Sequence, residues 1–169
     1  GGGGYKYIEN SIFTTKAHGC GGGYGTKGNG VSGGQIYGDE RLNQLYLGSG
    51  GGGSTQCIGG NGGGSFRITC NKLIIENGSC INCNGQNGNS KSIKDKISDM
   101  SGAGSGGSIH IVCDELSNFG DITAIGGKAI FGNYNGSGGM GRIRIDSPNI
   151  NNFGNINPTI GYNSIQPLK

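Results

Sequence analysis

The chain has few of the residues that build large cores, and little charge of either sign. Its 169 residues include no tryptophan, only 3 prolines and 7% aromatic residues, and 14% of them are charged, for a net charge of +3. Without a Gly-X-Y period or more proline, the chain cannot form a collagen-like triple helix. Its basic residues are spread out and do not form the stripe typical of nucleic-acid-binding proteins. We therefore expect no nucleic-acid partner.

Long hydrophobic runs are also missing. No segment approaches the roughly 18 apolar residues of a membrane-spanning helix, so we expect no membrane span in this chain. The sequence shows no signal peptide, but it begins with four glycines and no methionine. We expect a processed product or a piece of a longer protein, so the missing signal carries little weight.

Signatures of catalysis and cofactor binding are absent as well. Pectin-degrading enzymes with parallel strands need clustered carboxylates, alone or with a metal, and no two of the 10 carboxylates here fall in register. The glycine strings lack the Gly-Lys-Ser/Thr ending of a phosphate-binding loop, and they lack the Asp of calcium-binding nonapeptide repeats. His18 and Cys20 could begin a metal site, but no second pair has ligand spacing. We predict no enzyme, no cofactor, and no catalytic or metal-binding residues.

Glycine is what the chain has most of, with 41 residues. Such a chain could be a disordered low-complexity segment, because glycine costs much backbone entropy to fix. However, the apolar residues cluster in short Ile, Phe, Leu and Val runs between the glycine tracts. That pattern is typical of short strands separated by turns, and it favours an ordered, all-β protein.

Three stretches of the chain resemble one another, namely 64–70, 107–113 and 141–147. They start 43 and then 34 residues apart, a self-similarity typical of stacked repeats. Period-two alternation places their apolar residues on one face and Arg67, His110 and Arg144 on the other. The aligned inward ladders are Phe66, Ile109 and Ile143; Ile68, Ile111 and Ile145; Leu73, Leu116 and Ile150; and Cys80, Ile122 and Ile156.

Each repeat holds about three short strands in roughly 22 residues and adds a glycine-rich excursion. Three strands per turn, stacked in register, predict a parallel β-helix (β-solenoid) with long glycine-rich loops. A sandwich of antiparallel hairpins is the competing all-β fold, but it does not require this register identity. We predict a single domain over residues 1–169. Its irregular glycine-rich part covers about 1–62, and its clear repeats cover about 63–88, 106–130 and 139–163.

The glycine tracts require a separate explanation, because they cannot bury apolar surface. Ordered glycine can approach another backbone closely, or lie as extended polyproline-II-like segments bonded to one another. We expect the tracts to pack along one side of the strands instead of hanging as linkers.

The six cysteines are an even number in a chain with a thin core, which favours an oxidising compartment and disulfides. Cys70 and Cys113 share one position of the repeat, and in-register neighbours ~4.8 Å apart fall within the Cα window of a disulfide. We therefore predict a Cys70–Cys113 bond. Cys80 and Cys83 form a CxxC pair that could bind zinc or act in redox chemistry, but structural cysteines are favoured. The disulfide candidates are Cys20, Cys57, Cys70, Cys80, Cys83 and Cys113.

Two sequons accompany the cysteines. Asn77-Gly78-Ser79 and Asn135-Gly136-Ser137 fit the N-glycosylation pattern, which makes Asn77 and Asn135 candidate acceptors. Together with the cysteines, they predict a secreted protein located at the cell surface.

The repeats also resemble a known family. The segments 62–68, 73–78 and 80–85, and then 105–111, 120–127 and 138–143, resemble a glycine-rich β-solenoid repeat family of large secreted and cell-surface proteins in plants, algae, protists and some bacteria. The resemblance covers about residues 18–157. Cys70, Cys80 and Cys113 depart from it, because the family usually has aliphatic residues there, and they suggest local cross-linking.

The expected function is structural. A β-helix ends in rows of unpaired backbone groups, which invite head-to-tail stacking unless they are capped. We predict a subunit or module of an extracellular filament, appendage or coat, with copies of itself or neighbouring domains of a larger surface protein as partners. The alternative is a secreted carbohydrate-binding or adhesive module, with glycans as partners. The row of Arg67, His110 and Arg144 could then bind an anionic glycan, although such a row is more often a solvated face.

Overall fold

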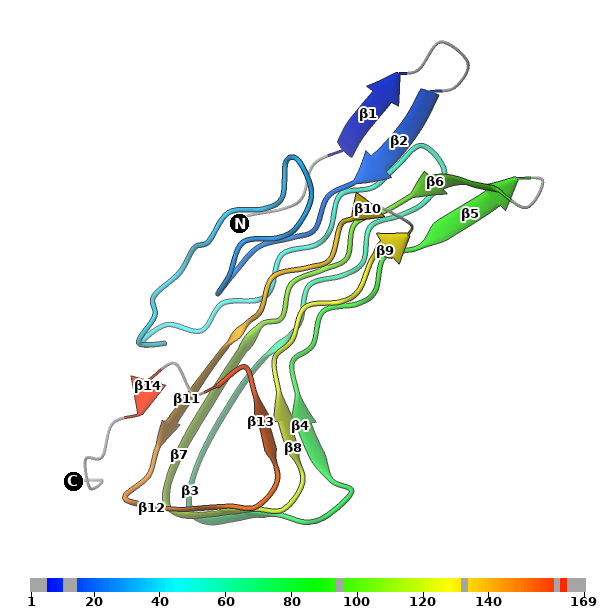
Figure 1. The fold of residues 1–169 in the computed structure, drawn as a ribbon. Coiled ribbons are helices and arrows are strands. Elements are labelled where there is room, and N and C mark those ends of the chain that lie inside the picture. The colour runs from blue at the N-terminus through cyan, green and yellow to red at the C-terminus, as the bar shows by residue number, and fades with distance from the viewer. Residues whose placement is uncertain (1–5, 11–14, 94–95, 132–133, 160–161, 164–169) are drawn as a thin grey trace.

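A computed structural model describes residues 6–10, 15–93, 96–131, 134–159 and 162–163 (Figure 1). All regular elements in these ranges are strands, so no described helix could cross a membrane. The strands are β1 (Lys6–Asn10), β2 (Thr15–Gly19), β3 (Ser65–Ile75), β4 (Cys80–Asn82), β5 (Ser90–Ile93), β6 (Lys96–Met100), β7 (Ser108–Asn118), β8 (Asp121–Thr123), β9 (Ile130–Phe131), β10 (Tyr134–Asn135), β11 (Arg142–Asp146), β12 (Asn149–Asn152), β13 (Asn155–Asn157) and β14 (Tyr162–Asn163).

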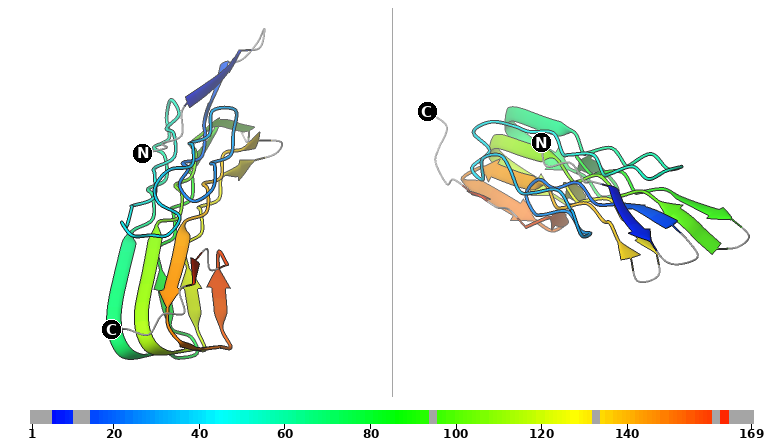
Figure 2. Two further views of the ribbon diagram at one scale, coloured as in Figure 1. Left: turned by 90° about the vertical axis from the view of Figure 1, so that its left-hand side faces the viewer. Right: turned by 90° about the horizontal axis from the view of Figure 1, so that it is seen from above.

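The strands form four separate sheets. In the five-stranded parallel sheet the order is β12-β7-β11-β14, with β3 also paired to β7, and a three-stranded parallel sheet has the order β13-β8-β4. These two sheets lie at one end of an elongated molecule, and the strands β1-β2-β6-β5 and β10-β9 lie at the other end (Figures 1 and 2). Glycine-rich segments run side by side between the two ends. The strands thus occupy the ends of the molecule, and the glycine tracts occupy its middle.

The parallel strands are arranged in three tiers. The first tier is β3 and β4, the second is β7 and β8, and the third is β11, β12 and β13. Across β3, β7 and β11, Phe66 lies opposite Ile109, which lies opposite Ile143. These partners are the ones that the shifts of 43 and 34 residues predict. The repeat spacing therefore predicts this pairing correctly.

The short strands differ from the prediction by one residue. Ile81 lies opposite Ile122, which lies opposite Ile156, whereas Cys80 lies opposite Asp121 and is exposed. The turn before β4 is longer than its counterparts, so Ile81 takes the inward place that the alignment assigned to Cys80.

The apolar core follows the tiers. In the second tier Ile109, Ile111, Leu116 and Ile122 are all 0% exposed, because tiers cover them on both sides. Ile143 and Ile145 of the third tier are also buried. Ile75 of the first tier is buried as well, and the other inward residues are only partly buried, namely Phe66, Ile68, Leu73 and Ile81 in the first tier and Ile150 and Ile156 in the third. The core is therefore closed in its middle and open at its ends.

Residues 101–107 form the centre of the glycine-rich bundle. Their successive N–H groups donate to three neighbouring segments in turn, and every third residue returns to the same neighbour. Gly102 and Ser105 donate to segment 49–52, Ala103 and Gly106 to segment 136–139, and Gly104 and Gly107 to segment 83–86. A repeat of three residues is that of a polyproline II helix. The tracts are thus extended segments bonded to one another, as the sequence predicts.

Glycine is required in this bundle because the backbones approach so closely. A Cβ atom at Gly102, Gly104 or Gly107 would lie 1.9 Å from a carbonyl oxygen of a neighbouring segment. Among the described glycines, only Gly30, Gly38 and Gly78 have φ in the left-handed region. Most of the glycines therefore provide space for a neighbouring backbone, and few are needed for an unusual φ.

The predicted parallel β-helix is wrong. The described strands form small, separate sheets that do not close into a coil, and two of the sheets contain antiparallel pairs. The physical reason lies in the glycine tracts. Their N–H and C=O groups bond to one another in a bundle, so the chain leaves the sheets after each set of strands instead of winding around a continuous core.

Candidate functional site

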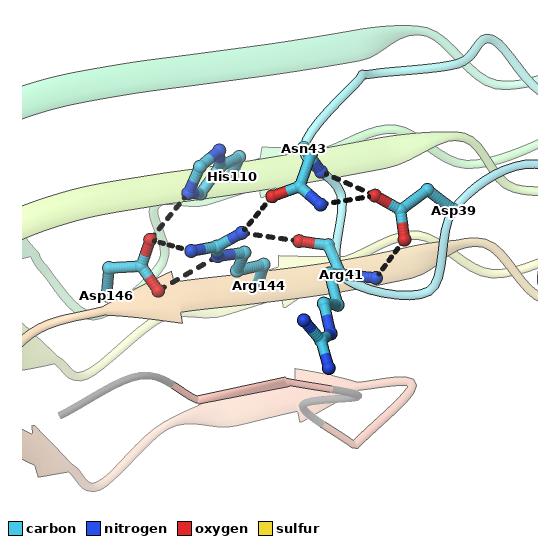
Figure 3. A network of polar contacts seen from close by, with 6 residues as sticks. All are labelled: Asp39, Arg41, Asn43, His110, Arg144 and Asp146. Atoms are coloured by element: carbon cyan, nitrogen blue, oxygen red, sulfur yellow. Dashed lines mark hydrogen bonds and ion pairs between the residues drawn. The ribbon is translucent and has the colours of Figure 1, made fainter.

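The outer face of the five-stranded sheet carries a polar network. Alternation in β7 and β11 turns Ser108, His110, Arg142, Arg144 and Asp146 away from the apolar core. Residues 37–47, which we call the strap, lie across this face (Figure 3). The network joins polar side chains of β7, β11 and the strap.

Asp146 is the centre of the network. Arg144 donates to it from Nε at 2.9 Å and forms an ion pair through Nη2 at 2.8 Å, and Nε2 of His110 lies 2.9 Å from Oδ2 (Figure 3). The side chains of Asp146 and Arg144 are 12% and 15% exposed. The carboxylate is thus bound on both oxygens and shielded from water.

Arg144 also holds the strap. Its Nη1 donates to the backbone oxygen of Arg41 at 2.6 Å and to Oδ1 of Asn43 at 3.3 Å. Within the strap, Asp39 accepts from the N–H of Arg41 at 2.9 Å and from Nδ2 of Asn43 at 2.7 Å. The backbone bond from Arg41 is the largest of the effects that lower the pKa of Asp39. The ionised carboxylate therefore shapes the turn that Arg144 contacts.

A second anchor lies beside the first. Arg142 donates from Nη1 to the backbone oxygen of Tyr37 at 2.5 Å, and its guanidinium lies 4.8 Å from the ring centroid of Tyr24. The hydroxyl of Ser108 donates to the backbone oxygen of Tyr46 at 2.7 Å and lies 2.7 Å from the Tyr24 hydroxyl. Burial raises the pKa of Tyr37. Both arginines thus fix the strap through its backbone.

The His110–Asp146 pair of this network has no nucleophile among the described residues on its second ring nitrogen. Burial lowers the pKa of His110, and the carboxylate of Asp146 only partly offsets that effect. A His–Asp pair activates a nucleophile in hydrolases through the second ring nitrogen. Here that nitrogen, Nδ1, is buried without a hydrogen-bond partner. Among the described residues, no group of three His, Cys, Asp or Glu side chains could hold a metal ion. The arrangement is suited to fixing the strap.

The three residues of the predicted outward row differ in burial and in pairing. Arg67, His110 and Arg144 lie opposite one another on β3, β7 and β11. However, His110 is 4% exposed and Arg144 is paired with Asp146, so only Arg67 is exposed. The row therefore does not form a shared cationic surface for an anionic glycan.

The predicted disulfides are wrong, since all six cysteines are free. Cys70 and Cys113 do lie directly opposite each other. Side chains on in-register parallel strands project in the same direction, which keeps the two Cβ atoms about 4.7–4.9 Å apart, whereas a disulfide needs about 3.5–4.5 Å. The Cα spacing of parallel neighbours therefore satisfies the disulfide window, whereas the parallel direction of their side chains does not.

The other cysteines are dispersed. Cys20 and Cys83 are buried, Cys57 is half-buried and Cys80 is exposed. Cys80 and Cys83 lie three residues apart. Cys80 is exposed and Cys83 is buried, so their side chains have different surroundings. Burial raises the pKa of Cys83.

Both candidate glycosylation residues are exposed. Asn77 lies in the turn between β3 and β4, where Gly78 has a φ of 80° and the Ser79 N–H donates to Glu76. Asn135 ends β10, and its Oδ1 accepts from the N–H of Ser137 at 3.0 Å. Glycosylation of either residue stays a prediction.

The first tier has an unpaired edge. Among the described strands, β3 pairs only with β7 and β4 pairs only with β8. We call Gly64, β3, β4 and the turn between them (residues 64–82) the open face. Its inward side chains Phe66, Ile68, Leu73 and Ile81 are only partly buried. This surface can accept a further strand through backbone hydrogen bonds and apolar contact.

The sequence predicts unpaired strand edges only as the ends of a β-helix, and it does not indicate the strap and its anchors. The available signal was the alternation of Arg142, Arg144 and Asp146 with buried isoleucines, together with Tyr24, Tyr37 and Tyr46 before the first repeat. Comparison of the chain with family models, with curated proteins and with solved structures found no match, so the family resemblance stays a prediction.

Proposed function

We propose that this protein is a structural module of an extracellular filament, appendage or coat, and that copies of it associate through unpaired sheet edges. The observation that carries the proposal is the open face. It combines a row of unpaired backbone groups with four partly buried apolar side chains on strands that already accept a parallel neighbour on their other side.

The difference in burial between the tiers supports this proposal. Ile109, between two tiers, is 0% exposed, whereas its partner Phe66 on the open face remains partly exposed. Addition of a further strand would bury Phe66 as the first tier buries Ile109. Burial of apolar surface stabilises association by roughly 25 cal/mol per Å².

The open face carries only part of the common protection against pairing. Exposed edges are usually blocked by proline, bulges or charged side chains. Neither β3 nor β4 contains proline, and the two charged residues of β3, Arg67 and Lys72, point away from the core, where Lys72 is already paired with Glu115 of β7. An 11-residue edge of this kind is expected to find a partner.

An extracellular location is supported by the exposed sequon residues Asn77 and Asn135. Secretion with glycan attachment would be detected as a mass shift that a glycosidase removes.

The test of the proposed function is assembly of the purified protein. Sedimentation velocity and negative-stain electron microscopy should show concentration-dependent growth into regular fibres or sheets, because association follows mass action. A chain that sediments as a monomer at every accessible concentration would exclude this function.

A further inference from the structure

Residues 47–63, which we call the glycine hairpin, lie at one margin of the bundle and lead into β3 (Figures 1 and 2). They form two antiparallel extended segments joined by a turn. The bonds between the segments run from the N–H groups of Gly48, Gly51 and Ser54 to the carbonyl oxygens of Gly63, Gly60 and Cys57, each at 2.9 Å. This spacing of three residues is that of a polyproline II helix. The hairpin thus continues the arrangement of residues 101–107.

One side of the first segment, residues 48–54, is open. In a polyproline II helix the N–H groups point in three directions that repeat every third residue. The first set points across the hairpin, and the second set, Ser49 and Gly52, donates into the bundle at 2.8 Å. The third set, Gly50 and Gly53, has no acceptor among the described residues, and both residues are exposed. These two N–H groups therefore face the open side.

The described molecule itself does not require glycine at these two positions. The nearest atom to a Cβ would be 3.5 Å away at Gly50 and 3.4 Å away at Gly53, which are ordinary contacts, and neither residue has a left-handed φ. By contrast, a Cβ at Gly51 would lie 2.2 Å from the carbonyl oxygen of Gly102, because segment 101–107 packs against it. Glycine at positions 50 and 53 leaves similar space on the open side, where no described backbone fills it.

Elsewhere in the bundle, exposed N–H groups are covered by side chains of a neighbouring segment. Such bonds run from the N–H groups of Asn61, Ile125 and Lys128 to the side-chain oxygens of Gln86, Asn84 and Asn87, at 3.2, 2.9 and 2.8 Å. No described side chain covers Gly50 and Gly53 in this way. The open side of the glycine hairpin is therefore available to a further segment.

The spacing and the charge of the open side define what fits it. Donors three residues apart in a polyproline II helix are about 9 Å apart, which is also the spacing of equivalent carbonyl oxygens in a second such chain. Residues 47–63 contain no charged side chain, so an ionic ligand finds no charge to pair with. Leu47, three residues before Gly50, and Ile58, opposite Gly53 in the hairpin, are 64% and 84% exposed. A neutral chain with small side chains fits this surface.

We propose that the open side of the glycine hairpin binds a glycine-rich segment of another protein chain, which adopts the polyproline II conformation and adds one position to the bundle. Its carbonyl oxygens accept from the N–H groups of Gly50 and Gly53, as carbonyls within the bundle accept from their neighbours. An extended chain fits better than a second folded copy, because margins of a copy carry side chains such as Asn84 and Asn87 that keep backbones apart. The inference is independent of the proposed function, since the hairpin lies outside the open face.

A glycine-rich peptide tests the binding directly. The probe carries the sequence of residues 101–107 twice in tandem, because that segment already has this conformation. It is added at millimolar concentration, since a free glycine chain loses much backbone entropy on binding. In NMR spectra of the wild type, kept below the concentration at which it associates, the amide proton signals of Gly50 and Gly53 should move downfield as they gain carbonyl acceptors. A control peptide with alanine for every glycine should not shift them, because its methyl groups prevent close approach.

Two protein variants locate the contact. The double variant Gly50→Ala, Gly53→Ala should unfold at the wild-type temperature or slightly above it, and its Kd for the peptide should rise at least about tenfold. Ser32→Thr is the matched control, because it adds a methyl group at an exposed residue of another segment. It should bind the peptide like the wild type. Should the double variant fail to fold, the wild-type signals decide alone.

Each contrary result has a definite meaning. Unchanged signals of Gly50 and Gly53 at millimolar peptide, or equal binding by the double variant, would overturn the inference. Shifts of these signals with protein concentration alone would assign the open side to a second copy and would also overturn it. Assembly without peptide binding would leave the proposed function in place, and peptide binding without assembly would leave this inference in place.

Discussion

Cys70 on β3 and Cys113 on β7 lie directly opposite each other in a parallel pair and remain separate thiols. Cys113 is completely buried beneath the first tier, and burial raises the pKa of its thiol. Cys70 is only partly buried because its strand is at the edge. The relationship shows that register alone does not create a cross-link, since side chains of parallel neighbours project side by side.

This relationship predicts the pattern of cysteine alkylation. Under native conditions iodoacetamide should modify the exposed Cys80 first, and the buried Cys20, Cys83 and Cys113 should react only after unfolding. Mass spectrometry in denaturant without reductant should find all 6 cysteines of the chain alkylated. Fewer adducts in denaturant, restored to the full number by reductant, would show that a disulfide exists and would contradict the structure.

The sequence predicts the strand tiers well because their cause is local. Alternation and repeat spacing depend on each residue and its counterpart, so the pairing of Phe66, Ile109 and Ile143 can be derived by alignment. The sequence does not show the path that the chain takes through the glycine tracts. Residues 101–107 contact several other segments mainly through backbone atoms, and backbone atoms carry no sequence signal. For that reason a closed coil was predicted where a bundle with separate sheets is found.

The strap was missed for a related reason. Arg142 and Arg144 contact backbone oxygens of Tyr37 and Arg41, and such acceptors are available on every residue. The sequence shows that the two arginines point away from the core, but it does not show what lies on that side. Their role as anchors of the strap follows only from the contacts, which Figure 3 shows for Arg144.

Removal of Arg144 should destabilise the protein and release the strap. The change Arg144→Ala leaves Asp146 shielded without its cation, and breaking a buried pair in this way costs about 3 kcal/mol. We expect a lower free energy of unfolding in urea and faster hydrogen exchange of the amides of residues 39–45. Arg67→Ala is the matched control from the same row, and as an exposed position it should change stability by less than about 0.5 kcal/mol. Equal losses for the two variants would refute the anchoring role.

His110 should make stability depend on pH. Burial lowers its pKa in the folded state, so the unfolded chain binds the proton more readily. This contribution to stability is fully present above the unfolded pKa of about 6.5 and is lost as the pH falls through the lower folded pKa. One proton limits the slope to about 1.4 kcal/mol per pH unit. Urea unfolding between neutral and mildly acidic pH should show this decline, and His110→Gln should flatten it. A variant that declines as steeply as the wild type would mean that other groups are responsible.

Substitution within the glycine bundle should be far more damaging than substitution at its margin. In Gly104→Ala the methyl group would lie 1.9 Å from the carbonyl oxygen of Asn61, and neither backbone can move without breaking bonds to several neighbouring segments. We expect a loss of about 3 kcal/mol or more, the upper end of the cost of overpacking. At the exposed Gly50, where the nearest atom to a Cβ is 3.5 Å away, alanine should be neutral or stabilise by up to about 1 kcal/mol, because it restricts the unfolded chain. Thermal unfolding of the two variants compares them directly. Similar midpoints would mean that close backbone approach is not what selects glycine in the bundle, and that its abundance has another cause.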